Sequence, residues 1–231
     1  NGTRLADFAD DLAQAGVRRV NVSLDTRDPV LFAQLTRRDR LADVLAGIAA
    51  AHAAGLAVKI NAVALKGLNE TELPALIEWA HGEGHAVTLI EVMPLGEVDG
   101  ERVEHYLPLT AVRERLASRW NLVALDESSG GPARYVRVEE TGGRLGFITP
   151  LTGNFCAGCN RIRVTATGRL YACLGGAEQV DLRAALRSAD PDAALAAALD
   201  EAMRIKPERH HFRIEAGAAP AQARHMSVTG G

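Results

Sequence analysis

Cysteine is scarce in this 231-residue sequence, and so are aromatic residues. Three cysteines cannot all pair with one another, which argues against a fold built on disulfide bonds. No stretch approaches the roughly 18 consecutive apolar residues that suggest a membrane-spanning helix. The formal net charge of −3 leaves neither sign in large excess, so the composition gives no argument for a nucleic-acid or membrane-surface partner.

The rest of the composition is that of an ordinary globular protein, with 47% hydrophobic and 24% charged residues. A chain of this length removes roughly 70% of its unfolded surface from water, which is enough for a real core. The length predicts one or two domains. The sequence opens with Asn1 rather than methionine, and we expect it to be a piece of a longer protein.

The first half of the sequence alternates between helical and strand patterns. Apolar residues at helical spacing predict three helices that end before Gly16, Gly55 and Gly82. Residues 17–24, 56–65 and 86–93 are typical of strands, and Asn69 with Glu72 resembles a capping box before the third helix. This alternation predicts parallel βαβ units in a sheet or a barrel.

After Pro94 the predicted elements become shorter. The sequence predicts a helix over 109–120, a strand over 121–125 and hairpins over 135–148 and 161–172. Two more helices are predicted over 182–186 and 191–203. His52 and His81 lie in predicted helices, where we expect them at the surface or at a helix end.

The predicted strands of the first half carry polar residues on one face. Asn21, Ser23 and Asp25 share a face of the first strand, and Lys59 shares a face of the second with Asn61. A lysine in mid-strand is costly to bury without a partner. The economical interpretation is a barrel whose inner face lines a polar cavity. The alternative is an open sheet whose second face meets water.

Cys156 and Cys159 form a Cys-x-x-Cys motif, and Cys173 follows after thirteen intervening residues. Thiolates in such a pattern bind zinc or iron–sulfur clusters. A redox dithiol of thioredoxin type would need a βαβ context that is absent here. Two interpretations stay open. One is a cluster with three cysteine ligands and one open iron, and the other is a structural zinc with a histidine as fourth ligand (His210, His211 or His225).

Arg161 and Arg163 directly follow the Cys-x-x-Cys motif. In a strand both side chains lie on one face, and paired guanidinium groups suit a phosphate. The pattern therefore indicates an anion site beside a metal-binding loop. The alternative is an exposed Arg-x-Arg on a surface strand. Arg134, before another predicted strand, is a further candidate for the cavity.

These segments together resemble the GTP 3′,8-cyclase family of molybdenum-cofactor biosynthesis, whose members are radical S-adenosylmethionine enzymes. The resemblance is ordered and covers essentially the whole chain. It rests on residues 21–25 (NVSLD), 58–61 (VKIN), 90–94 (IEVMP), 156–163 with Cys173, and 225–231 (HMSVTGG). The segment from the cysteines to the arginines and the Gly-Gly terminus are its most specific parts.

The resemblance implies an α/β fold in two parts. Residues 1–107 would form the C-terminal half of an incomplete (βα)₆ TIM-like barrel. Residues 108–231 would form an α+β iron–sulfur domain that binds GTP, closes the barrel and ends in the Gly-Gly tail. The family's Cys-x-x-x-Cys-x-x-Cys motif, which binds the cluster that cleaves S-adenosylmethionine, does not occur in this sequence. We therefore expect that motif to precede Asn1, and we expect this chain to be inactive alone.

The resemblance also implies the cofactors and their ligands. Cys156, Cys159 and Cys173 would hold a C-terminal [4Fe-4S] cluster whose open iron binds GTP. Ser23 and Met93 would contact S-adenosylmethionine. That cofactor and a second [4Fe-4S] cluster are expected only together with the preceding segment.

The implied contacts to GTP come from Lys59, Arg161, Ile162 and Arg163. Gly230 and Gly231 are implied catalytic residues that would reach into the active site, where only residues without side chains fit. Thr88 stands where many family members have an arginine, which removes one expected contact to phosphate. Lys59 and the two arginines would still offset the charge of the triphosphate.

The implied reaction converts GTP to (8S)-3′,8-cyclo-7,8-dihydroguanosine 5′-triphosphate, the first step of molybdopterin synthesis, which makes the full-length protein a lyase. The product would pass to the cyclic pyranopterin monophosphate synthase in the cytoplasm. A homodimer stays open, and no nucleic-acid or membrane partner is expected. The alternatives are a zinc- or cluster-binding module without catalysis, and a different radical S-adenosylmethionine enzyme with an auxiliary cluster.

Overall fold

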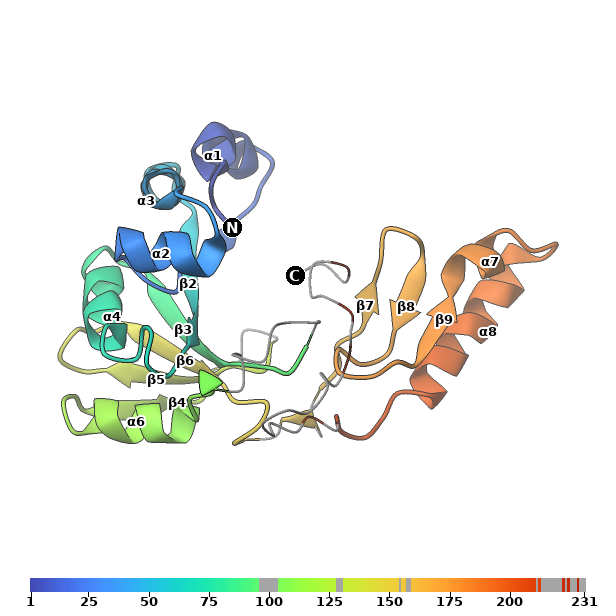
Figure 1. Cartoon of the computed structure of the whole chain (residues 1–231). Coiled ribbons are helices and arrows are strands. Elements are labelled where there is room, and N and C mark those ends of the chain that lie inside the picture. The colour runs from blue at the N-terminus through green and yellow to red at the C-terminus, as the bar shows by residue number, and fades with distance from the viewer. Residues whose placement is uncertain are drawn as a thin grey trace. The chain divides into compact units, whose positions relative to one another are not determined.

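The structure is a computed structural model (Figure 1) that describes residues 1–95, 104–127, 131–153, 155–156, 159–210, 212, 222, 224 and 228. Contacts between residues divide the chain into two compact units. The first unit comprises Asn1–Val92 and His105–Thr152, and the second comprises Met93–Glu104 and Gly153–Gly231. Within the described residues, no helix combines the length and the apolar character that crossing a membrane requires.

A six-stranded mixed sheet forms the centre of the first unit, with the strand order β1-β2-β3-β6-β5-β4. The strands are β1 (Arg19–Ser23), β2 (Ala57–Ala64), β3 (Ala86–Glu91), β4 (Leu122–Leu125), β5 (Arg134–Val138) and β6 (Arg144–Ile148). The pairs β1–β2, β2–β3 and β3–β6 are parallel. The pairs β6–β5 and β5–β4 are antiparallel. The predicted parallel units and the β5–β6 hairpin are confirmed. That the hairpin continues the same sheet was not evident from the sequence.

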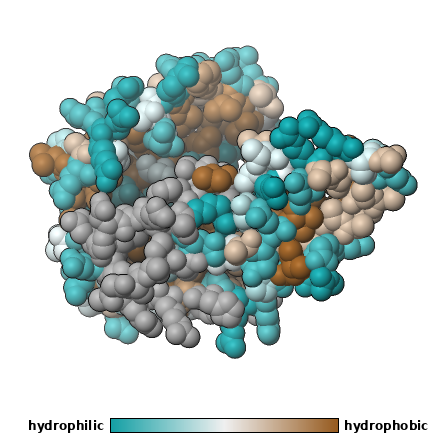
Figure 2. All heavy atoms as spheres, turned by 45° about the vertical axis from the view of Figure 1, so that its right-hand side comes forward, coloured by the Kyte–Doolittle hydropathy of each residue, from teal (hydrophilic) through white to brown (hydrophobic). Residues whose placement is uncertain are grey.

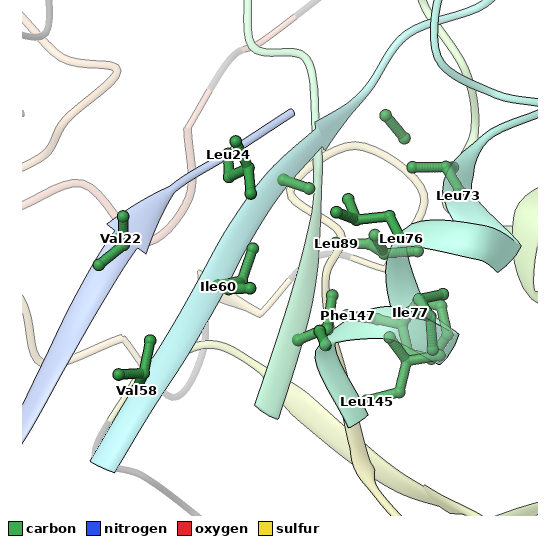
Figure 3. Close-up of a cluster of buried hydrophobic side chains, with 14 of the residues drawn as sticks. Val22, Leu24, Val58, Ile60, Leu73, Leu76, Ile77, Leu89, Leu145 and Phe147 are labelled. Atoms are coloured by element: carbon green, nitrogen blue, oxygen red, sulfur yellow. The ribbon is translucent and has the colours of Figure 1, made fainter. Parts of the chain in front are cut away.

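Helices of the first unit pack on one face of this sheet. They are α1 (Leu5–Gln14), α2 (Pro29–Thr36), α3 (Leu41–Ala53), α4 (Leu73–Gly82) and α6 (Leu109–Ala117). Alternate strand residues such as Ile60 and Leu89 form one buried cluster with Ile48 of α3, Ile77 of α4 and Val112 of α6. Figure 3 shows part of this cluster, in which side chains of α4 meet those of the strands. The other face of the sheet carries the polar residues.

Two features of the first unit differ from the sequence-based expectations. α2 was not predicted, because it is short, although Asp28 caps it by accepting a hydrogen bond from Leu31 N (2.7 Å) and Pro29 opens it. His81 lies in the last turn of α4, as expected for a histidine at a helix end, but it is buried rather than at the surface. Its Nδ1 lies 2.6 Å from Thr141 Oγ1 and its Nε2 lies 3.0 Å from the Arg144 carbonyl, so it joins α4 to the β5–β6 hairpin.

The capping box predicted at Asn69 and Glu72 is wrong. No side chain caps α4, and Glu72 instead accepts a 2.5 Å hydrogen bond from Thr26 Oγ1. The fully buried Asn69 donates through Nδ2 to the carbonyls of Asp25 (2.7 Å) and Val63 (2.8 Å). Asn69 therefore ties together the carboxyl ends of β1 and β2, which is the edge where Ser23 lies.

The second unit contains a three-stranded antiparallel sheet, β7-β8-β9, followed by two helices. Its elements are β7 (Arg163–Val164), β8 (Arg169–Tyr171), β9 (Gln179–Asp181), α7 (Leu182–Leu186) and α8 (Pro191–Arg204). The hairpin and both helices are confirmed, whereas β9 was not predicted. Figure 2 draws the whole chain, and on the face that it shows hydrophilic side chains alternate with several groups of apolar ones.

The two compact units do not divide at residue 107. Residues 108–152 belong to the first unit because β4, β5 and β6 complete its sheet through the pairing of β3 with β6. Compactness alone does not define a functional domain, so the division into a barrel half over 1–107 and an iron–sulfur domain over 108–231 stays a prediction.

Candidate functional site

Lys59 lies on the polar face of the first unit's sheet. Its side chain is held in the middle of β2 between buried Val58 and Ile60, and only 8% of the residue is exposed. Its Nζ donates a 3.4 Å hydrogen bond to Tyr135 Oη on β5. Among the described residues, no carboxylate forms an ion pair with Lys59. A buried cation without an acidic partner is costly unless a ligand supplies the negative charge.

Two further polar side chains lie on the same face. Asn61 of β2 and Thr88 of β3 are register neighbours. Asn61 Oδ1 and Thr88 Oγ1 are both buried, and neither has a hydrogen-bond partner among the described residues. A buried polar atom without a partner costs about 1–3 kcal/mol, so such atoms mark places where a ligand or water completes the bonding. We call Lys59, Asn61, Thr88 and Tyr135 the polar cluster.

Gly146 on β6 allows the members of the polar cluster to approach one another. It is the register neighbour of both Thr88 and Tyr135. A Cβ atom at Gly146 would lie 2.7 Å from Tyr135 Cε1 and 3.0 Å from Thr88 Oγ1. Tyr135 thereby replaces Arg134 as the residue of β5 that faces the cluster, since Arg134 itself is exposed. The predicted polar face is confirmed for Lys59 and Asn61.

The charged residue of the third strand lies elsewhere. Glu91 is paired in register with Ala64, on the helix-covered face, and is only 1% exposed. Its carboxylate accepts hydrogen bonds from Leu109 N (3.0 Å), Leu151 N (2.9 Å) and Thr152 N (3.1 Å), and from the Thr152 hydroxyl. Glu91 therefore holds the start of α6 and the segment after β6 in place.

Ser23 ends β1 beside a cavity of about 520 Å³. Asp25, Thr26 and Phe32 line the same cavity. Asp25 Oδ1 accepts a 2.8 Å hydrogen bond from Val63 N, and burial raises the pKa of its carboxyl above the ordinary value, against the smaller opposing effect of that bond. The cavity thus combines a hydroxyl with a half-buried carboxyl group at the carboxyl end of a parallel strand, where α/β folds bind their ligands.

Met93 belongs to the second unit and is half-buried. Since Ser23 and Met93 lie in different units, their joint contact with S-adenosylmethionine stays a prediction. The same holds for Lys59 of the first unit and the Arg161–Arg163 segment of the second. Gly230 and Gly231 lie outside the described residues.

The three cysteines of the second unit are half-buried, and none forms a disulfide. A 2.9 Å hydrogen bond from Cys159 N to the Cys156 carbonyl closes a tight turn between the first two. β7 pairs with β8 and aligns Arg163 with Tyr171, so the chain reverses its direction between Cys159 and Cys173. Lys206 Nζ then donates 2.8 Å hydrogen bonds to the carbonyls of Arg161 and Ala172.

The donor set fits a thiolate-bound metal centre in its chemistry, since three cysteine thiols lie on two adjacent arms of the chain. Among the described residues, no group of three or more Cys, His, Asp or Glu side chains is close enough to hold a metal ion. Among these residues there is also no histidine close enough to the cysteines to act as the further ligand of a structural zinc ion. His210 packs its ring on Phe212 with 4.2 Å between centroids, and His211 and His225 lie outside the described residues.

Arg161 and Arg163 are half-buried, whereas Ile162 and Val164 are 40% and 53% exposed. This inverts the usual preference of apolar and charged side chains and shows the two arginines on one inward side. Arg161 packs over the Phe155 ring at 5.6 Å. Burial lowers the pKa of the Arg163 guanidinium, and the nearby Arg161 charge lowers it further. Two neighbouring guanidinium groups favour the binding of an anion between or beside them.

Sequence reasoning missed two side chains that organise these sites. Tyr135 belongs to a predicted strand in which alternation places it on the face opposite to Arg134, but no motif marks it as a site residue. Lys206 follows a predicted helix and carries no motif, so only its position in space identifies it. In the second unit, Arg224 also donates to the carbonyls of Leu174 (3.0 Å) and Gly176 (3.2 Å), beside Cys173.

Comparisons with known proteins give one consistent result. The family model for Molybdenum Cofactor Synthesis C matches residues 85–212, and that for the Radical SAM superfamily matches residues 1–80. The chain is 69% identical over 231 residues to "GTP 3',8-cyclase" of Erythrobacter litoralis, and the aligned region covers 100% of this chain and 70% of that protein. It is 59% identical over 232 residues to "GTP 3',8-cyclase" of Bradyrhizobium diazoefficiens, and the aligned region covers 100% of this chain and 67% of that protein.

Proposed function

Since the chain belongs to the GTP 3′,8-cyclase family within the radical S-adenosylmethionine superfamily, we propose that it carries the GTP-binding machinery of such a cyclase. The reaction converts GTP to (8S)-3′,8-cyclo-7,8-dihydroguanosine 5′-triphosphate in molybdenum-cofactor biosynthesis. One structural observation carries the site assignment. A single hairpin bears Cys159, the half-buried Arg161 and Arg163, and the arm that leads to Cys173.

The cysteines supply one end of the proposed site. Cys156, Cys159 and Cys173 would hold a [4Fe-4S] cluster, and three thiolates leave one iron open for a ligand atom of GTP. When bound, S-adenosylmethionine and its own cluster would supply the radical that takes a hydrogen atom from the ribose. The residues of this chain would bind and orient GTP and exclude side reactions.

Positively charged side chains would bind the triphosphate of GTP. Lys59, Arg161 and Arg163 would offset the triphosphate charge, with Ile162 of the same segment beside it. The absence of an acidic partner for Lys59 among the described residues and the inward side of the two arginines support this role. Ser23 and Asp25 border the cavity that would receive S-adenosylmethionine together with Met93. Gly230 and Gly231 would approach the reacting atoms.

The proposed architecture is an incomplete (βα)₆ barrel closed by the iron–sulfur domain. All three cysteines of the 231 residues are assigned to one cluster, whereas the reaction needs a second cluster for S-adenosylmethionine. We therefore expect these residues by themselves to bind GTP without converting it. The cyclic pyranopterin monophosphate synthase as the next enzyme, the cytoplasmic setting and the homodimer follow from the family and stay predictions.

Anaerobic reconstitution of the chain with iron and sulfide tests the assignment. Iron and sulfide analysis should give about one four-iron cluster per chain, and Cys156→Ala should abolish it. Thr167→Ala, in the turn of the same hairpin, is the matched control that leaves every thiol in place. Two clusters per chain, or an unchanged spectrum of Cys156→Ala, would contradict the proposal. One equivalent of zinc without iron and without GTP binding would favour the zinc-binding module.

GTP binding gives a second test on the reconstituted chain. Calorimetry should detect binding to the wild-type chain, and the double variant Arg161→Ala/Arg163→Ala should weaken it strongly, because both cations lie on one side of the hairpin. Arg169→Ala, an exposed arginine on β8 of the same hairpin, should bind like the wild type. Equal binding by all three proteins would argue against an anion site here.

A further inference from the structure

The two arms that carry the cysteines are not joined by strand pairing at the cysteines themselves. The ladder between β7 and β8 ends with Arg163 opposite Tyr171. Beyond that pair, one arm runs back to Cys159 and the other runs on to Cys173. A site that needs thiolates from both arms requires some other contact to keep them together.

Lys206 makes that contact. Its Nζ donates to the carbonyl oxygens of Arg161 and Ala172, and both distances are 2.8 Å. Arg161 lies two residues after Cys159, and Ala172 lies directly before Cys173. One ammonium group therefore bridges both arms immediately next to their cysteines.

The bridge is anchored outside the arms. Lys206 lies two residues after the end of α8, and α8 packs on β9 and α7. Lys206 lies 45 residues after Arg161 and 34 residues after Ala172 in the sequence. Because the ammonium is charged, each bond is stronger than one between neutral groups, and the half-buried setting limits competition from water.

We propose that Lys206 is a positioning residue for the iron–sulfur cluster. It holds the Cys156–Cys159 arm and the Cys173 arm next to each other, and its charge offsets that of the thiolates and of the bound cluster. Net charge and neighbouring donors are among the properties that set the stability and potential of such clusters. The identity of the cluster rests on the proposed function, whereas the bridging of the arms does not.

The first test uses the metal-free chain. In a Cys156→Ala background only Cys159 and Cys173 remain, one on each arm. Dibromobimane becomes strongly fluorescent when it links two thiols. The rate at which the fluorescence increases therefore reports how often Cys159 and Cys173 come within cross-linking distance. Lys206→Met should slow this rate about tenfold, because two charge-assisted hydrogen bonds are lost. Lys206→Arg should recover most of it.

Arg204→Met is the matched control. Arg204 lies two residues before Lys206, is exposed, and pairs with Glu201 on its own helix. This variant should cross-link at the wild-type rate. Equal rates in Lys206→Met and Arg204→Met would overturn the proposal. If circular dichroism shows that Lys206→Met has lost its fold, Lys206→Gln takes its place. Its amide keeps an N–H donor group but has a shorter side chain and no charge, so its rate must also fall.

The second test uses the reconstituted chain with all three cysteines. A ferrous chelator should remove iron from Lys206→Met about tenfold faster than from the wild type or from Arg204→Met. Identical rates of iron loss would overturn the role in cluster retention. If the wild-type chain takes up no iron at all, the proposed function fails, and the cross-linking rates still decide whether Lys206 bridges the arms.

Discussion

The Nζ atom of Lys59 lies 3.4 Å from the phenol oxygen of Tyr135, although 76 residues separate the two in sequence. β2 and β5 are not neighbours in the sheet, since β3 and β6 lie between them. The contact spans these strands because Gly146 leaves the space that a Cβ atom would fill. The polar cluster therefore depends on a residue without a side chain as much as on its four polar members.

Lys59→Met should have opposite effects on binding and on stability. Loss of the ammonium should weaken GTP binding about tenfold or more, which corresponds to one charged hydrogen bond. The unliganded chain should keep or gain stability, because a buried charge without an acidic partner is removed. Calorimetry with GTP and thermal unfolding measure the two effects. Lys66→Met, at an exposed lysine of the same unit, should change neither, and unaltered GTP binding by Lys59→Met would exclude Lys59 from the site.

Tyr135→Phe should have a smaller effect in the same direction. The ring that fills the space beside Gly146 remains, and only the hydroxyl that accepts the Lys59 hydrogen bond is lost. We expect GTP affinity to fall about fivefold, in line with one ordinary hydrogen bond of about 1 kcal/mol. Tyr106→Phe is the matched control in the same unit. A similar loss in both variants would mean that the hydroxyl of Tyr135 has no special role.

Glu91→Gln should destabilise the first unit by about 2–3 kcal/mol. The amide that replaces one carboxylate oxygen would face backbone N–H groups of Leu109 or of Leu151 and Thr152, all of which need an acceptor. Urea unfolding measures the difference. Glu114→Gln, an exposed position on α6, should cost almost nothing. Equal stabilities of the two variants would show that the buried carboxylate is not needed to fix α6.

Stability should fall as the pH drops below 6.5, and His81 should account for part of the loss. Burial lowers the pKa of His81 beneath its ordinary value of 6.5, although the Arg144 carbonyl acts in the opposite direction. The unfolded chain then binds a proton more readily than the folded chain. The stability contributed by neutral His81 is therefore fully present above pH 6.5 and is lost as the pH falls through the folded-state pKa.

His81→Gln should flatten this dependence. The free energy of unfolding at pH 7.5 minus that at pH 5.5 should be smaller in the variant than in the wild type, as urea titrations can show. Some dependence should remain, because burial also lowers the pKa of His85. His105→Gln, at a histidine bonded to the Lys66 carbonyl, provides the control. An unchanged pH dependence in His81→Gln would rule out this assignment.

Two neighbouring glycines should respond differently to alanine. A Cβ atom at Gly143 would lie 2.1 Å from His81 Cγ, so Gly143→Ala must displace the buried ring and should cost about 3 kcal/mol. Gly142 has a φ of +68° and nothing within 4 Å of its added Cβ atom, so Gly142→Ala should cost only about 1–2 kcal/mol of backbone strain. Thermal unfolding of both variants tests the order, and the reverse order would contradict the packing of His81 against the hairpin.

The sequence by itself determined the pattern of the fold and indicated the chemistry of the candidate sites. Alternating apolar periods identified the parallel strands β1, β2 and β3, because a side chain's face follows from its position along a strand. The polar face with Lys59 and Asn61 followed from the same alternation. The cysteine spacing indicated a metal centre, since few other functions use three thiols in this pattern.

Only the tertiary structure decided which distant groups meet. The parallel pairing of β6 with β3 places Tyr135 near Lys59, and the position of α8 brings Lys206 to the cysteine arms. It also brought the backbone N–H groups of Leu109, Leu151 and Thr152 to Glu91, and it buried His81 under a hairpin. Such contacts depend on how elements pack in three dimensions. They leave no periodic signal in the sequence, because a single long-range hydrogen bond constrains two positions and not the residues between them.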